Sequence, residues 1–107
     1  MEIAKIKKDL KKTIKSIRDE LNAAKGEAGT TRCLAHDIPK AMMTDRQVEK
    51  RTATVNCGAG WHSTGKDSKS LAHTVNESAA FKEFLERAGA TARIEPTGYG
   101  YQIRITY

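Results

Sequence analysis

A glycine-rich run at residues 60–66 comes nearest to a chemical motif in this sequence. It ends in Lys66 and matches the first seven positions of a phosphate-binding loop, in which backbone N–H groups and the lysine bind phosphates. The eighth position of that motif carries a Ser or Thr for Mg²⁺, whereas this chain has Asp67, whose carboxylate would face the phosphates. We therefore predict a loop leading into a helix, with Lys66 and Lys69 offering at most one contact to a nucleic-acid phosphate.

Two cysteine–histidine pairs have the types and spacings of metal ligands. Cys33 and His36 form C-x2-H, and Cys57 and His62 form C-x4-H, which suits structural zinc. The alternative is that the cysteines are reduced, small buried thiols and that the two imidazoles lie at the surface. We favour that alternative and expect neither a metal ion nor another cofactor.

Catalytic chemistry has no clear support in the sequence. Cys57, His62 and Asp67 include a nucleophile, a base and a carboxylate, but no spacing brings them into one site. We therefore expect a protein that is not an enzyme.

The N-terminal segment is the only one whose charge points toward a partner. Residues 1–25 contain eight lysines or arginines and four acidic residues, so they supply +4 of the net charge of +6. Lysines recur there at helical spacing, at positions Lys5, Lys8, Lys12 and Lys15. Such a surface attracts polyanions or acidic proteins, although a solvated helix face would have the same composition.

An aliphatic stripe accompanies these lysines. Its members recur every three or four residues and are Ile3, Ile6, Leu10, Ile14, Ile17 and Leu21. This period predicts an amphipathic helix from about Ile3 to Ala24, ended by Gly26. The stripe would either pair two copies of the chain as a homodimer or pack on the sheet of its own domain.

Aromatic and basic residues alternate near the C-terminus. Small sheets that bind single-stranded nucleic acids stack bases on exposed aromatic rings and hold phosphates with arginines. Tyr101 and Tyr107 share a strand face with Ile103 and Ile105, and we expect all four in the core. The second contact surface that we predict therefore consists of Arg93, Tyr99 and Arg104.

The middle of the chain predicts short elements. Residues 31–36 are compatible with a strand that ends before Pro39. Thr44 and Gln47 have the spacing of a capping box, which starts a helix, but the following residues also alternate like a strand. We favour a strand from Arg51 to Cys57 because it is rich in β-branched residues.

The C-terminal half predicts one helix and two strands. The helix begins at Asp67 or Ser68 and ends at Gly89. Its expected apolar stripe comprises Leu71, Val75, Ser78, Phe81, Leu85 and Ala88, with Phe84 beside it. Strands at residues 91–95 and 101–107 flank a turn at residues 96–100.

These elements define an α+β class for the 107 residues. We expect one globular domain made of a basic amphipathic helix at residues 1–25, an irregular linker at residues 26–50 and a β-α-β-β unit at residues 51–107. The sheet should be mostly antiparallel. The sequence contains no long apolar run and no export signal, so we expect a cytoplasmic protein without membrane contact.

The leading functional hypothesis is a small non-enzymatic protein that binds nucleic acid or a nucleoprotein through its basic helix. The alternative is a protein-docking inhibitor or adaptor, of the type that phages and mobile elements encode, which binds an acidic protein surface. Either protein would fit the size and the net charge of +6.

Overall fold

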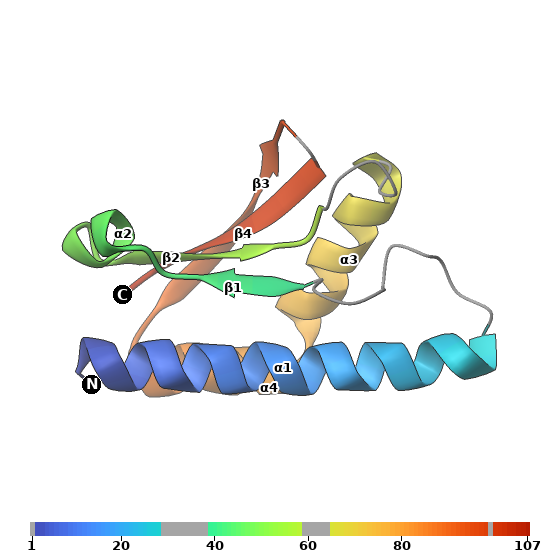
Figure 1. The fold of residues 1–107 in the computed structure, drawn as a ribbon, viewed down its shortest axis with the longest axis horizontal. Helices are drawn as coiled ribbons and strands as arrows, with labels where there is room; N and C mark the ends of the chain where they lie inside the picture. The colour runs from blue at the N-terminus through green and yellow to red at the C-terminus, as the bar shows by residue number, and fades with distance from the viewer. Residues whose placement is uncertain (1, 29–38, 59–64, 99) are drawn as a thin grey trace.

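The computed structural model describes residues 2–28, 39–58, 65–98 and 100–107, with the side chains of residues 22–28 and 65–68 outside that description. These residues form helices and strands in the arrangement of Figure 1. In chain order they are α1 (Ile3–Ala28), β1 (Lys40–Met42), α2 (Asp45–Glu49), β2 (Thr52–Asn56), α3 (Gly65–Glu77), α4 (Ala79–Ala88), β3 (Thr91–Thr97) and β4 (Gly100–Thr106). The predicted α+β class is confirmed.

The four strands form one antiparallel sheet in the order β1-β2-β4-β3. Ala41 pairs with Val55, and Val55 pairs with Ile103, so these side chains share one face of the sheet. Helices α1, α3 and α4 pack on this face (Figure 1). The opposite face carries the intervening side chains and is mostly polar.

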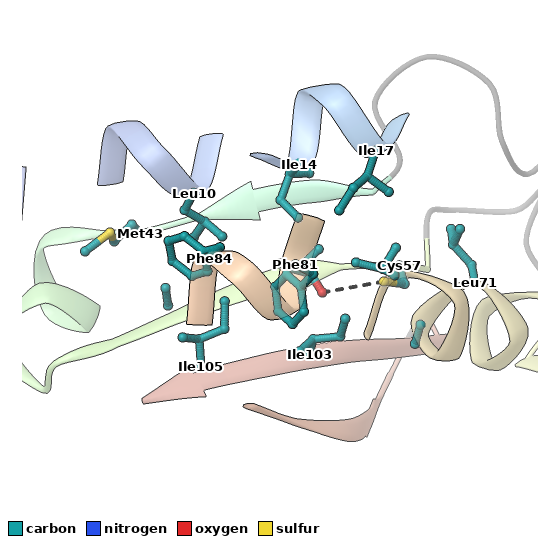
Figure 2. Packing of buried hydrophobic residues seen from close by; sticks show 14 of the residues in the cluster. Leu10, Ile14, Ile17, Met43, Cys57, Leu71, Phe81, Phe84, Ile103 and Ile105 are labelled. Carbon is teal, nitrogen blue, oxygen red and sulfur yellow. Dashed lines mark hydrogen bonds between the residues drawn. The ribbon is translucent and has the colours of Figure 1, made fainter. Parts of the chain in front are cut away.

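The core lies between the sheet and these helices (Figure 2). Phe81 and Phe84 of α4 are fully buried, and their ring centroids are 6.2 Å apart. Around them lie the buried aliphatic side chains of α1 and the isoleucines Ile103 and Ile105 of β4. Tyr101 and Tyr107 are half-buried against the same core, which confirms their predicted face.

The aliphatic stripe of α1 packs inside the molecule. Ile6, Leu10 and Ile14 are each 1% exposed, and Ile3 and Leu21 pack at the edge of the core. Of the two predicted roles of the stripe, the structure therefore shows packing within its own domain. A homodimer through these residues would have to open the core.

Helix α1 is longer than predicted, because it continues past Gly26 to Ala28. A glycine inside a helix costs only about 1 kcal/mol relative to alanine. The burial of the aliphatic side chains earlier in α1 offsets this cost. In the described part of the chain, no helix is both long and apolar enough to cross a bilayer.

The predicted single helix after residue 66 is wrong, since two helices, α3 and α4, meet at Ser78. The Ser78 hydroxyl accepts a hydrogen bond from the Phe81 N–H at 3.3 Å and donates one to the Val75 carbonyl at 2.9 Å. Ser78 is thus the N-cap of α4 and not part of an apolar stripe. The C-terminal unit is β-α-α-β-β, and α4 ends as predicted at Gly89, which has a φ of 62°.

The segment predicted as a linker contains β1 and α2. The capping box is confirmed: the Thr44 side chain accepts from the Gln47 N–H, and the Gln47 side chain accepts from the Thr44 N–H. The strand predicted at residues 51–57 is observed as β2. The strand predicted at residues 31–36 lies outside the described residues.

The final hairpin has longer strands than predicted. Pro96 pairs with Tyr101, and Thr97 pairs with Gly100, so the predicted turn at residues 96–100 is too long. Pro96 is accommodated because β3 is an edge strand, where a missing N–H donor does not interrupt a second ladder.

Candidate functional site

The predicted lysines of α1 point away from the core. Lys5, Lys8, Lys12 and Lys15 are all exposed. Their direction follows from the helical period, because the aliphatic residues between them face the sheet and α4. These four side chains form an exposed row along α1.

A shallow groove of about 270 Å³ runs between α1 and β1, beside this row. The residues that line it are Lys11, Ile14, Lys15, Arg18, Lys40 and Ala41. They include four cationic side chains and no carboxylate. The groove therefore concentrates positive charge at one edge of the sheet.

Two polar contacts shape this groove. Arg18 Nη1 donates to the Pro39 carbonyl at 3.4 Å, which holds the guanidinium near the start of β1. Lys15 Nζ lies 3.2 Å from Asp19 Oδ2 in an exposed ion pair. Exposed pairs of this kind are weak, so Lys15 remains able to exchange Asp19 for an external anion.

The other side of α1 has mixed charge. Asp9 accepts two hydrogen bonds of 2.9 Å from Arg87 of α4, through Arg87 Nε and Nη2. A groove of about 400 Å³ between α1 and α4 is lined by Asp9, Glu83 and Arg87, together with Lys12, Thr13, Ser16 and Ala80. Positive charge on α1 is thus strongest on its outer side and on the side of β1.

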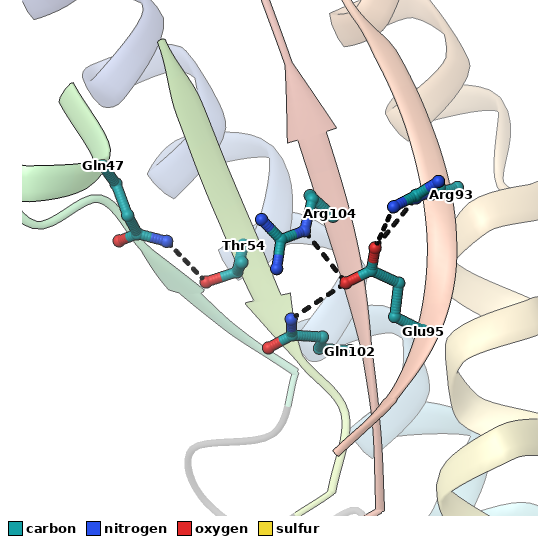
Figure 3. A network of polar contacts seen from close by, with 6 residues as sticks. All are labelled: Gln47, Thr54, Arg93, Glu95, Gln102 and Arg104. Carbon is teal, nitrogen blue, oxygen red and sulfur yellow. Dashed lines mark hydrogen bonds and ion pairs between the residues drawn. The ribbon is translucent and has the colours of Figure 1, made fainter. Parts of the chain in front are cut away.

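The two sheet arginines that we predicted lie together, but not beside the lysines. Arg93 and Arg104 are directly opposite each other on β3 and β4. They share the Glu95 carboxylate at 2.7 Å and 2.9 Å (Figure 3). The hydrogen bonds that Arg104 and Arg93 donate to the Glu95 carboxylate lower its pKa, and the bond from Arg104 has the larger effect. The carboxylate offsets half of the charge of this pair.

This arginine pair lies on the open, polar face of the sheet. Arg104 alternates with Ile103 and Ile105, whose side chains face the helices, so the arginines lie on the opposite side of the sheet from α1. The structure therefore does not place the predicted second contact surface next to the lysine row. Tyr99 lies outside the described residues.

The remaining predicted positions do not join the groove. Lys69 is exposed on α3, which does not line the groove, and the side chain of Lys66 lies outside the description. Of the four zinc-ligand candidates, only Cys57 is described, and Cys33, His36 and His62 are not. Within the described residues, no cluster of three or more His, Cys, Asp or Glu side chains could hold a metal ion.

Cys57 is poorly suited to metal binding in this fold. Its side chain is fully buried, and Sγ lies 3.8 Å from the Val55 carbonyl oxygen. Burial raises the pKa of the thiol from 9.0 to about 12, so the thiolate that metals bind is harder to form here than in an exposed cysteine.

The sequence predictions did not single out Lys11, Arg18 and Lys40 as site residues. Helical periodicity places Lys11 and Arg18 on one side of α1 and could have identified them together. Lys40 joins them only through the pairing of β1 with β2, for which the sequence has no local signal.

No family model, curated protein or solved structure matches this chain. A functional assignment must therefore come from the chemistry of the site.

Proposed function

We propose that this protein binds nucleic acid, alone or within a nucleoprotein, through a cationic surface on α1 and β1, and that it does so without catalysis. We define the cationic surface by its exposed or groove-lining side chains, which are Lys5, Lys8, Lys11, Lys12, Lys15, Arg18 and Lys40. One observation carries the proposal: the residues that line the groove between α1 and β1 include Lys11, Lys15, Arg18 and Lys40 and no acidic residue.

The chemistry of these side chains favours phosphates as ligands. A lysine ammonium is a compact charge that binds phosphate oxygens without reading a base, and Arg18 adds a planar guanidinium with several donors. Each phosphate that such cations neutralise releases condensed counterions, which supplies sequence-independent affinity. We therefore expect binding that depends weakly on base sequence and strongly on salt.

A charge-matched pair of variants tests this proposal. The groove variant combines Lys11→Gln, Lys15→Gln and Lys40→Gln, and the control combines Arg46→Gln, Lys50→Gln and Lys82→Gln, which are exposed residues outside the groove. Both variants lose three positive charges. Fluorescence anisotropy with labelled DNA and RNA at low salt should show affinity lower by about 10- to 100-fold for the groove variant and a much smaller loss for the control.

Two results would contradict the proposal. Equal losses in both variants would mean that only the net charge attracts nucleic acid. No binding by the wild-type protein at low salt would exclude nucleic acid as the ligand. It would favour the alternative, in which this protein is an inhibitor or adaptor whose cationic surface docks on an acidic protein.

A further inference from the structure

The outer edge of β3 is the longer of the two edges of the sheet. The strand order β1-β2-β4-β3 leaves β3 with one neighbour, and β3 has seven residues whereas β1, at the other edge, has three. An edge strand of this length is a template on which a further strand can pair. Its backbone groups and its side chains together determine which strand fits.

The pairing of β4 fixes which residues of β3 direct their backbone groups outward. The Cys57 N–H donates to the Tyr101 carbonyl at 3.0 Å, so the backbone groups of Tyr101 point toward β2. Pro96 lies directly opposite Tyr101, and its carbonyl therefore points to the outer edge. Because this direction alternates along the strand, the N–H and C=O groups of Ile94 and Ala92 also point outward. In the part of the chain that the structure describes, neither residue forms a hydrogen bond on that edge.

The side chains of β3 place opposite charges on either side of Ile94. Arg93 and Glu95 lie on the open face of the sheet, and their nearest charged atoms are 2.7 Å apart (Figure 3). Arg93 is 76% exposed and can therefore reach a neighbouring strand. Ile94 points to the helix side, where it packs half-buried at the edge of the core. The edge thus presents one cation and one carboxylate, placed symmetrically about Ile94.

This arrangement is complementary to a second copy of itself. When two β3 strands pair antiparallel about a twofold axis at Ile94, Arg93 of each copy lies directly opposite Glu95 of the other. These are the pairs without backbone hydrogen bonds, in which side chains come closest. An axis one residue earlier or later would place Arg93 opposite Arg93, or Glu95 opposite Glu95, and like charges in such pairs are destabilising. The charges therefore select one register.

The backbone can form hydrogen bonds in that same register. The Ile94 residues of the two copies would exchange N–H and C=O groups, and each Ala92 N–H would donate to the Pro96 carbonyl of the other copy. Pro96 has no N–H to return, so each Ala92 carbonyl stays without a bond from it. The two Ile94 side chains would meet on the helix side and lose further exposure to water, which stabilises the pairing.

We propose that two copies of this protein dimerise edge to edge through β3, with the twofold axis at Ile94, so that their sheets become one continuous antiparallel sheet. This dimer differs from one built on the aliphatic stripe of α1, because it leaves the core closed. The groove between α1 and β1 lies at the opposite edge of the sheet and stays open. The proposal is therefore independent of the proposed function.

Two charge reversals test both the edge and its register. Arg93→Glu makes both edge charges negative, and Glu95→Arg makes both positive. Each variant alone should self-associate at least about tenfold more weakly than the wild-type protein, because like-charge pairs replace opposite-charge pairs. An equimolar mixture of the two variants restores opposite charges at every pair and should form a heterodimer. The matched controls are Lys82→Glu and Glu77→Arg, which change the same charges at an exposed ion pair outside β3.

Sedimentation velocity over a series from micromolar to submillimolar protein measures the association, and thermal melting followed by circular dichroism shows that each variant is folded. We expect a wild-type dimer that grows with concentration, the same dimer in both controls, and recovery of a dimer in the mixture. A wild-type protein that stays monomeric over the whole series would overturn the proposal. So would edge variants that dimerise as well as the controls, or a mixture that associates no better than its components. If Glu95→Arg did not fold, because Arg104 loses its acceptor, the comparison of Arg93→Glu with Lys82→Glu would decide alone. Equal association of those two variants would overturn the proposal.

Discussion

Cys57 shows how burial decides the chemistry of a single residue. Its thiol lies in the core beside β2, where burial raises the pKa to about 12. The sequence made this residue a candidate for zinc binding or nucleophilic catalysis, since residue type and spacing carry no information about burial. In the fold it is a small apolar side chain.

Cys57 should therefore react only after unfolding. In a Cys33→Ser background, where Cys57 is the sole remaining cysteine, we expect slow alkylation of the native protein at about pH 8 and fast alkylation in denaturant. The folded pKa lies above the unfolded value of 9.0, so stability should fall as the pH rises from 9.0 toward 12. Mass spectrometry measures the labelling, and rapid labelling of the native protein would contradict the described burial.

At the scale of helices and strands, the positions where these elements begin and end show which features could be predicted from the sequence and which could not. Gly89 ends α4 as predicted, because the position after the last helical turn has a left-handed backbone conformation, which favours glycine. The break at Ser78 could not be inferred from the apolar period, which continues from Val75 to Phe81 across it. Strand β1 is three residues long and depends on pairing with β2, so it has no periodic signal of its own.

The cap at Ser78 can be tested by substitution. Ser78→Ala removes the acceptor for the Phe81 N–H and should lower the free energy of unfolding by about 1 kcal/mol. Ser78→Asp keeps an acceptor and should retain most of that stability. The control is Ser70→Ala, at an exposed position inside α3, where we expect a change within about 0.5 kcal/mol. Urea denaturation gives these values, and equal effects at both serines would argue for one continuous helix.

For the whole molecule, α1 has two different sides. Its aliphatic side completes the core, and its outer side carries exposed lysines. The sequence was sufficient to predict both sides because they follow from a single helical period. It was not sufficient to predict that β1 adds Lys40 to the lysines, or that Glu95 partly neutralises the two sheet arginines on the opposite face.

The packing of α1 on the core should be visible in stability. Leu10 is 1% exposed in the core, so Leu10→Ala should lower the free energy of unfolding by about 2–5 kcal/mol. Lys8→Ala, on the outer side of the same helix, should change it by less than about 0.5 kcal/mol. If Leu10→Ala were as well tolerated as Lys8→Ala in urea or thermal denaturation, α1 would not be part of the folded core.

The central claim is that the cationic surface binds phosphates, and the salt dependence of nucleic-acid binding tests it most directly. We would measure the Kd of the wild-type protein, the groove variant and the control by fluorescence anisotropy over a series of salt concentrations. The account predicts a steep linear fall of log affinity with log salt for the wild-type protein and the control. It also predicts a slope shallower by about 2–3 for the groove variant, because three phosphate contacts are lost. Affinity that does not change with salt, or an equal slope for all three proteins, would contradict the account.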